Sequence, residues 1–310
     1  MTGVPHRLIL DSDIGSDIDD EFTLAMIWGS PELDLLGLSA SYGDTVLRTR
    51  IARRMAELVG RGLRVEPGDS ATRSGREIWW AGHEGDAYGD LTGFAVEQST
   101  EGGPSRGAAL IGELATGEPR SHLLAIGPLA TVASALDEDA GLADRIEHLW
   151  IMGGDFATAA AEHNILSDVD AAQRVLSAGI PTTLVPVDIT TRVHLHEPDV
   201  ARIEQTGELG RLLAVQARAW MRRWDEDYEI PHDPLTLLAL LRPDLFEFTG
   251  PGTVVVSDGT DGQEVGCTRF IPGAGSVRLV TGVDVEGAAR EIADRIVAGL
   301  APIGSGGAPA

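Results

Sequence analysis

The chain has 310 residues, enough to bury a large hydrophobic core without disulfides or a structural metal. It carries 24 Lys and Arg residues against 48 Asp and Glu residues, and this net charge of −24 disfavours nucleic-acid polymers and anionic membranes as partners. All 24 basic residues are arginines, which excludes Schiff-base chemistry on a lysine and the lysine of a phosphate-binding loop.

Apolar runs of strand length alternate with helix-period segments through the first two thirds of the chain. This alternation predicts an α/β fold with an open, mostly parallel, Rossmann-like sheet and helices on both faces. The expected strands are residues 7–12, 35–41, 63–66, 122–126, 148–152 and 182–187. The expected helices between them are residues 19–28, 45–59, 106–115, 129–136 and 170–178.

The alternation changes after residue 188, which predicts a small C-terminal extension of the sheet. Its expected elements are helices over 208–228, from His232 and over 285–300, and strands over 252–256, 265–270 and 277–280. We expect one domain over residues 1–303 and a disordered tail over 304–310. The irregular stretch 67–104 has the length and composition of a mobile loop that covers a binding site.

The chain shows no signal-like N-terminus and no apolar run long enough to cross a bilayer. Its single cysteine, Cys267, cannot form a disulfide within the chain. These observations favour a cytoplasmic protein that does not insert into a membrane.

Five carboxylates follow the first expected strand within ten residues, at Asp11, Asp13, Asp17, Asp19 and Asp20. In an open α/β sheet, ligands bind where the chain leaves the carboxyl ends of the strands. Like charges this dense repel one another unless a cation neutralises them, and an oxygen-only ligand set favours Ca²⁺ or Mg²⁺. Capping of the next helix is the alternative, but it accounts for two or three of the acids rather than five.

A second source of oxygen ligands lies far along the chain, in His232-Asp233-Pro234. The alternative for Asp233 is an ordinary helix cap before a proline at the first helical position. Aromatic residues precede this motif with a spacing of four, at Trp220, Trp224 and Tyr228. On one helix, they would offer faces on which a planar ring can stack, although core packing is an equally good explanation.

Four further motifs follow the acidic cluster in the chain: Tyr42-Gly43-Asp44, Gly127-Pro128-Leu129-Ala130, Met152-Gly153-Gly154 with Ala161-Glu162-His163-Asn164, and His232-Asp233-Pro234. In this order, the set resembles the signatures of the inosine-uridine-preferring nucleoside hydrolase family, and the resemblance extends over residues 6–300. It implies a ribonucleoside hydrolase that uses Ca²⁺ to break the N-glycosidic bond, releases ribose and a free base for purine or pyrimidine salvage, and forms a homodimer or homotetramer.

The resemblance also implies roles for individual residues. Asp13 and His232 would be catalytic, the first as the base for the attacking water and the second as the partner of the leaving base. The implied metal ligands are the side chains of Asp13, Asp20 and Asp233 and the backbone carbonyl of Ala130. The implied substrate-binding residues are Asp19, Asp44, Glu162, Asn164, His83 and Tyr228. Asp11 and Asp17 would bind the metal or support the site, because two extra residues before Asp19 leave the register open.

Two alternatives differ in class from a nucleoside hydrolase. A nucleoside- or ribose-binding protein could keep this fold and metal without turnover, since Asp44 places a carboxylate where many family members carry an amide. A haloacid-dehalogenase-type Mg²⁺ phosphatase also begins with Asp-x-Asp after a strand, but such sites use a lysine and this chain has none.

Overall fold

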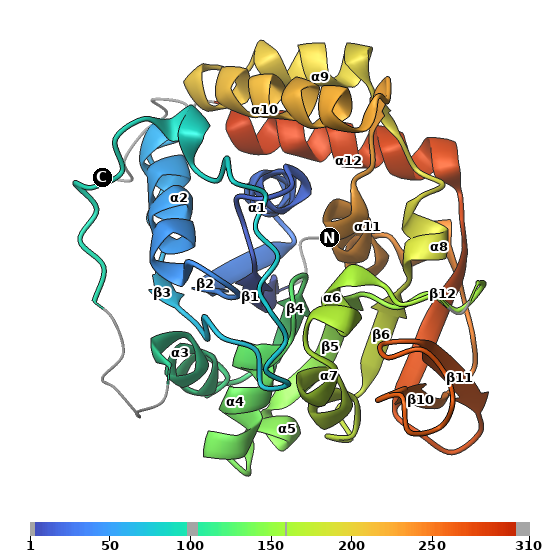
Figure 1. Ribbon diagram of the computed structural model, residues 1–310. Coiled ribbons are helices and arrows are strands. Elements are labelled where there is room, and N and C mark those ends of the chain that lie inside the picture. The colour runs from blue at the N-terminus through green and yellow to red at the C-terminus, as the bar shows by residue number, and fades with distance from the viewer. Residues whose placement is uncertain (1–3, 98–104, 159, 302–310) are drawn as a thin grey trace.

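The computed structural model describes residues 4–97, 105–158 and 160–301 (Figure 1). Within them, one ten-stranded sheet has the strand order β11, β10, β12, β6, β5, β4, β1, β2, β3, and β9 pairs with β12. Neighbouring strands from β12 to β3 are parallel, which confirms the predicted mostly parallel sheet. These strands are β1 (His6–Ser12), β2 (Leu33–Ala40), β3 (Val65–Pro67), β4 (Ser121–Ala125), β5 (Ile146–Met152), β6 (Thr182–Val185) and β12 (Val277–Val283).

Antiparallel strands form the predicted C-terminal extension at one edge of this sheet. They are β9 (Phe246–Phe248), β10 (Gly252–Val256) and β11 (Thr268–Pro272). A separate two-stranded ribbon pairs β7 (Leu195–His196) with β8 (Tyr228–Glu229). The tail predicted over 304–310 lies outside the described residues.

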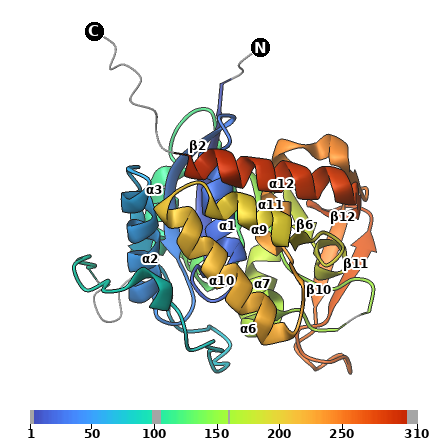
Figure 2. The same cartoon turned by 90° about the horizontal axis from the view of Figure 1, so that it is seen from above.

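Two layers of helices cover the sheet (Figures 1 and 2). One layer comprises α1 (Asp19–Trp28), α2 (Thr45–Leu58), α8 (Val187–Thr190), α9 (Glu197–Glu204), α10 (Glu208–Trp224), α11 (His232–Leu241) and α12 (Val285–Leu300). The other comprises α3 (Arg106–Leu114), α4 (Ala130–Glu138), α5 (Leu142–Arg145), α6 (His163–Ser167) and α7 (Val169–Leu176). Strand β1 shows why both layers are needed: Leu8 and Leu10 enter one core and Ile9 enters the other, all 0% exposed.

The predicted elements occur in the expected order, with shifts at several ends. Helix α10 ends at Trp224 rather than at residue 228, because Asp225 takes a left-handed conformation with φ 57°. Strand β6 ends at Val185, and β11 begins at Thr268, three residues later than expected. The short helices α5, α6, α8 and α9 were not predicted, nor were the 3₁₀ turns η1 (Asp86–Tyr88) and η2 (Pro243–Leu245).

The last helix, α12, packs directly against the first, α1 (Figure 2). A β-carbon at Gly29 would lie 1.9 Å from the carbonyl oxygen of Arg295, and one at Gly299 would lie 1.8 Å from that of Ala25. Glycine is therefore required at both positions, since any side chain would force the two helices apart.

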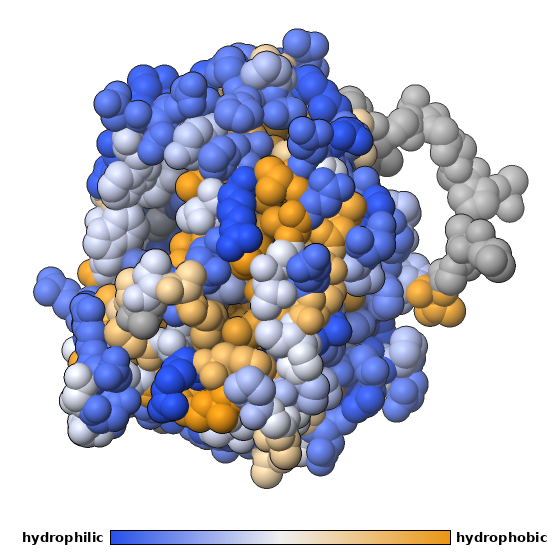
Figure 3. Space-filling model, turned by 90° about the vertical axis from the view of Figure 1, so that its right-hand side faces the viewer, coloured by the Kyte–Doolittle hydropathy of each residue, from blue (hydrophilic) through white to orange (hydrophobic). Residues whose placement is uncertain are grey.

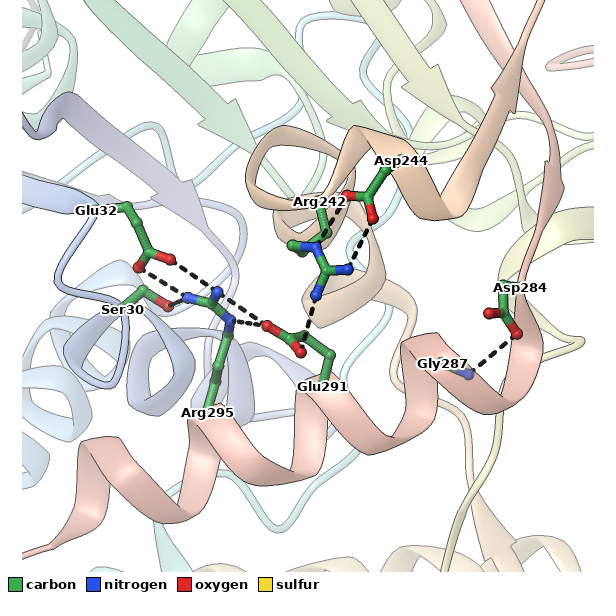
Figure 4. A network of polar contacts seen from close by, with 8 residues as sticks. All are labelled: Ser30, Glu32, Arg242, Asp244, Asp284, Gly287, Glu291 and Arg295. Atoms are coloured by element: carbon green, nitrogen blue, oxygen red, sulfur yellow. Dashed lines mark hydrogen bonds and ion pairs between the residues drawn. The ribbon is translucent and has the colours of Figure 1, made fainter. Parts of the chain in front are cut away.

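A network of ion pairs reinforces this contact between the two ends of the chain (Figure 4). Arg295 of α12 pairs with Glu32 at 2.8 Å and with Glu291 at 2.9 Å. Glu291 also pairs with Arg242 at 3.1 Å, which links α12 to the end of α11. The network therefore joins the C-terminal ends of α1 and α11 to α12, while the predicted metal-ligand motifs lie at the opposite, N-terminal ends of α1 and α11.

The face on the side of β10, β11 and β12 shows apolar side chains framed by hydrophilic ones (Figure 3). Exposed apolar side chains on these and adjoining elements include Ile271 and Val285, which are 41% and 38% exposed. Among the described residues, no helix combines the length and apolar composition that crossing a membrane requires.

Candidate active site

A cavity of about 530 Å³ lies beyond the carboxyl ends of β1, β4 and β5. Its walls come from segments that are far apart in the sequence. The predicted site residues that line it are Asp13, Asp17, Asp19, Asp20, Glu162, Asn164, His232 and Asp233, and Trp220 and Trp224 line it as well. The fold therefore brings most of the predicted site residues to one place.

Asp19, Asp20 and Asp233 form the densest acidic cluster in this cavity. Each offers a carboxylate oxygen within 4.8 Å of the others, and all three residues are buried. Asp19 and Asp20 begin α1 and Asp233 lies in the first turn of α11, so the packing of these two helices creates the cluster. The backbone N–H of Asp233 donates to Asp19 Oδ2 at 3.3 Å, and Ser12 Oγ donates to Asp20 Oδ1 at 2.5 Å.

The electrostatics of this cluster fit a hard cation. Burial and the mutual repulsion of the carboxylates raise the pKa of Asp19, Asp20 and Asp233 well above the usual range. Oxygens that surround Ca²⁺ at about 2.3–2.6 Å lie no more than about 5 Å apart, which the cluster satisfies. Asp17 is not part of this group, although its charge contributes to the raised pKa of Asp19 and Asp233.

Asp13 lies beside the cluster, directly after β1. Its carboxylate approaches Gly127 so closely that a β-carbon at Gly127 would lie 2.5 Å from Asp13 Oδ1. Burial raises the pKa of Asp13, while the charges of Arg48 and His163 partly oppose that rise. Its own charge raises the pKa of Asp20 and Asp233, so Asp13 and the cluster act on one another electrostatically.

Arg48 of α2 holds the turn that follows Asp13, and the sequence did not reveal this role. Its guanidinium is 0% exposed and donates to the backbone oxygens of Asp13, of Ile14 at 2.9 Å and of Tyr42 at 2.7 Å. It also donates to Ser16 Oγ at 3.1 Å. A buried arginine with this set of acceptors fixes the backbone that presents Asp13.

Glu162 and Asn164 line the cavity from the start of α6. Backbone N–H groups of Gly154, Asn164 and Ile165 donate to the Glu162 carboxylate at 3.0, 2.7 and 3.1 Å. The side-chain amide of Asn164 donates to Ile126 O at 3.0 Å. Both side chains are thereby held in fixed orientations at the cavity wall.

His232 is the first residue of α11 and lies beside Asp233 at the cavity wall. Its Nδ1 lies 2.6 Å from Thr190 Oγ1, and burial lowers the pKa of His232 to about 4. The imidazole is therefore neutral near pH 7.

The aromatic residues differ from the prediction in one respect. Trp220 and Trp224 lie on α10 with ring centroids 5.8 Å apart, and both line the cavity rather than the core. Tyr228 does not continue their helix, because α10 has ended; it lies in β8, stacked on His194 with ring centroids 3.8 Å apart. Trp79, which lies between β3 and η1, also lines the cavity and was not predicted as a site residue.

The other predicted residues lie at varying distances from the cavity. Asp44 is exposed and caps α2 by accepting from Leu47 N at 2.9 Å, and it does not line the cavity. His83 lines a neighbouring pocket, with Nε2 3.0 Å from Ser16 O. Asp11 is buried behind Asp13 and accepts from Ser39 and Ser41, and Ala130 begins α4 just after Gly127.

We expect the metal-free protein to lose stability as the pH rises from about 4 to 8. Burial raises the pKa of Asp11 to about 7 and that of Glu21 to about 8, whereas carboxyl groups in the unfolded chain titrate near 4. The folded state therefore keeps protons that the unfolded state has released in this interval, and the free energy of unfolding falls as pH rises. For Asp11 alone the change is on the order of 4 kcal/mol.

Thermal unfolding in EDTA at pH 5 and pH 8 tests this expectation. The Tm should be lower at pH 8, and saturating Ca²⁺ should reduce the difference by neutralising the acidic cluster. A Tm in EDTA that rises between pH 5 and pH 8 would contradict it.

Comparison with known proteins gives consistent matches over nearly the whole chain. The model of the family "Inosine-uridine preferring nucleoside hydrolase" matches residues 8–290. Uridine nucleosidase 1 of Arabidopsis thaliana is 30% identical over 264 residues, which cover 80% of this chain and 77% of that protein. A plant nucleoside hydrolase of known structure superposes with a TM-score of 0.78 at 25% identity, covering 94% of this chain and 99% of the other. The purine-preferring ribonucleoside hydrolase from Gardnerella vaginalis has the same fold, with a TM-score of 0.80 at 22% identity and coverage of 95% and 99%.

Proposed function

Because the chain belongs to the inosine-uridine preferring nucleoside hydrolase family, it is an N-glycosyl hydrolase of ribonucleosides, and we propose that its reaction depends on Ca²⁺ and on Asp13 as the base. In the net reaction, a water oxygen bonds to C1′ of the ribose, the N-glycosidic bond breaks, and its electron pair leaves with the base. The observation that carries this proposal is the presence of Asp13, Asp20 and Asp233 in one cavity that tryptophans also line.

Asp13 is positioned to deprotonate the attacking water. A general base works best when its pKa approaches the operating pH, and burial moves the pKa of Asp13 in that direction. Gly127 and the turn held by Arg48 restrict where its carboxylate can lie. Asp13 takes one proton of the water, and the other stays on the new hydroxyl at C1′ of the ribose. Asp13 then releases its proton to solvent, and the departing base takes up one proton from solvent, so that the products are ribose and the neutral free base.

Asp20 and Asp233, with Asp13 and the backbone carbonyl of Ala130, would hold Ca²⁺, and Asp19 is close enough to join them. When bound, Ca²⁺ supplies positive charge beside the attacking water and lowers its pKa. The sugar acquires positive charge as the bond to the base breaks, and the surrounding carboxylates stabilise that charge.

The ribose hydroxyls would bind to the acidic residues and to the amide at the cavity wall. Three backbone N–H groups hold the Glu162 carboxylate, so it can accept from a sugar hydroxyl without a rotamer change. The amide nitrogen of Asn164 is used by Ile126 O, which leaves its side-chain oxygen to accept from a second hydroxyl. Asp19 is the candidate partner of the ribose diol. Asp44 is not part of this proposal, because it caps α2 at an exposed position.

The leaving base would contact His232 and the tryptophans. A neutral His232, oriented by Thr190, is suited to donating a hydrogen bond to the base rather than to delivering a proton as an imidazolium ion. Trp79, Trp220 and Trp224 offer ring faces and edges on which a planar base can stack. His83 and Tyr228, which line adjoining pockets, remain candidates for contacts at the periphery of the base.

Neither alternative accounts for the site as well. A haloacid-dehalogenase-type phosphatase does not agree with the family to which the chain belongs. A binding protein without turnover was motivated by Asp44, and the exposed helix cap at that position removes the motive.

Nucleosides should be hydrolysed well and nucleotides poorly. A 5′-phosphate would enter a cavity walled by carboxylates in a protein with a net charge of −24, and the repulsion opposes binding. We expect kcat/KM for inosine and uridine to exceed that for their monophosphates by about 100-fold or more, which corresponds to about 3 kcal/mol. The measurement is release of reducing sugar from Ca²⁺-loaded protein. Comparable rates for inosine and its monophosphate would contradict the expectation, and thermal shift without product would identify a binding protein.

Three further predictions belong to this proposal. We propose that residues 1–303 form a single catalytic domain, because β1, the first strand in the chain, and β12, the last, belong to the same ten-stranded sheet. Assembly into a homodimer or homotetramer and a location in the cytoplasm stay predictions.

A further inference from the structure

A second cavity of about 370 Å³ adjoins the candidate active site. The two cavities share Asp17, Trp220, Trp224 and His232 in their walls. Because His232 and the tryptophans are the proposed partners of the leaving base, the second cavity lies at the base end of the site rather than at the ribose end. Its remaining walls include Glu229, which no step described above uses.

Glu229 is a buried carboxylate without a full set of partners. It belongs to β8 and is 1% exposed. Its Oε1 accepts from Ile230 N at 3.2 Å, whereas Oε2 has no hydrogen-bond partner. Within the described part of the chain, no arginine pairs with it in an ion pair. Burying a carboxylate oxygen without a hydrogen-bond donor costs free energy, so a ligand that donates a hydrogen bond to it gains affinity.

Asp17 also lines this cavity and adds a second carboxyl group to its wall. Asp17 accepts from the backbone N–H of Ile18 at 2.6 Å through Oδ1. Two carboxyl groups carry four oxygens, so acceptors outnumber donors here even when the pair shares a proton. The walls between them are aromatic, which suits the faces of a planar ring whose edge carries the donors.

We propose that Glu229, together with Asp17, selects nucleosides whose base carries an exocyclic amino group, in preference to the matched bases that carry a carbonyl oxygen at that position. The inference rests on the proposed function and deepens it. An amino group presents two N–H donors to the carboxylates, whereas a carbonyl oxygen in the same place faces them as a second acceptor and is repelled. Adenosine and cytidine should therefore exceed inosine and uridine as substrates, which sets this chain apart from the preference in the family's name.

A second metal ion is the other possible occupant of this cavity. Hard divalent cations require about six or more oxygen ligands, or retained waters, around one point. Within the described residues, the metal-like spacing of three acids occurs at Asp19, Asp20 and Asp233 and does not include Glu229. The amino-bearing base is therefore the occupant that the geometry favours.

The decisive variant is Glu229→Gln, compared with Glu286→Gln as the matched control. Glu286 is exposed on α12 and lines neither cavity, so its substitution should leave base selectivity unchanged. With Ca²⁺-loaded protein, kcat/KM should favour adenosine over inosine and cytidine over uridine by about 10-fold or more. Glu229→Gln should bring both ratios close to one. Each ratio is measured within one protein sample, so partial unfolding of a variant cancels.

Binding of the free bases gives a readout that needs no turnover. Adenine should quench the tryptophan fluorescence of the Ca²⁺-loaded protein with a Kd about 10-fold below that of hypoxanthine, and Glu229→Gln should remove the difference. If no nucleoside were hydrolysed, the proposed function would be wrong. The ratio of the Kd values for adenine and hypoxanthine would still decide this inference. The inference would be overturned if the unmodified protein showed kcat/KM ratios of one for adenosine over inosine and for cytidine over uridine, or preferred the carbonyl-bearing bases. It would also be overturned if Glu229→Gln lost a second Ca²⁺ per chain and kept its selectivity.

Discussion

Replacement of Asp13 by asparagine is expected to lower kcat by about three orders of magnitude while the fold is retained. The amide keeps the size of the carboxylate and an oxygen toward the cluster, but it cannot take a proton from water. The positions of Gly127 and Arg48 are unaffected, because Arg48 bonds to the backbone of residue 13 rather than to its side chain. Steady-state hydrolysis of several nucleosides with saturating Ca²⁺ gives the measurement.

Asp34→Asn is the matched control for this variant, since Asp34 is an exposed residue of β2. Its activity should equal that of the unmodified protein. The pH profile adds a second test, because the limb that reports ionisation of the base should disappear in Asp13→Asn. A kcat within about tenfold of the unmodified value would assign the base to another residue.

Asp233→Asn is expected to abolish Ca²⁺ binding in the micromolar to millimolar range and yet to stabilise the metal-free protein. The carboxylate of Asp233 is a charged ligand whose loss should weaken Ca²⁺ binding by about 100-fold or more. In the metal-free protein, the same charge is repelled by Asp19, Asp20 and Asp13, so its removal relieves buried repulsion. Activity at moderate Ca²⁺ should be lost in consequence.

Calorimetric titration with Ca²⁺ and thermal unfolding in EDTA separate the two effects. The Tm in EDTA should rise, while the increase in Tm on adding Ca²⁺ should vanish. Asp294→Asn, which alters a surface ion pair with Arg202, should change neither. A variant that still gains stability from Ca²⁺ as the unmodified protein does would show that Asp233 is not a ligand.

The parts of the site that sequence could predict are those fixed by local patterns. A strand followed at once by dense carboxylates places Asp13, Asp19 and Asp20 at the carboxyl edge of a parallel sheet, whatever the rest of the chain does. His232-Asp233-Pro234 begins a helix by its own chemistry, and two such helix starts meet because α1 and α11 pack together. The ambiguity between Asp17 and its neighbours was a question of register, which spacing alone does not resolve.

The residues that sequence could not predict depend on contacts between distant segments. Arg48 is one of several arginines on α2, and only the fold shows that it is the fully buried one. Glu229 follows three exposed residues, Asp225, Glu226 and Asp227, in the sequence, and only the fold shows that Glu229 itself is buried, in β8. Tyr228 was placed on a helix by its spacing, but Asp225 ends α10 through a left-handed conformation that the spacing does not encode.

The packing of α12 against α1 determines when this part of the fold can form during synthesis. The packing of α1 is completed by the helix that begins at Val285, so the segment that carries Asp19 and Asp20 lacks part of its packing until α12 has been synthesised. Until α12 has formed, a nascent chain carries the acidic start of α1 without this packing. The integrity of α12 is therefore a condition for assembling the packed form of α1 and not only for keeping it.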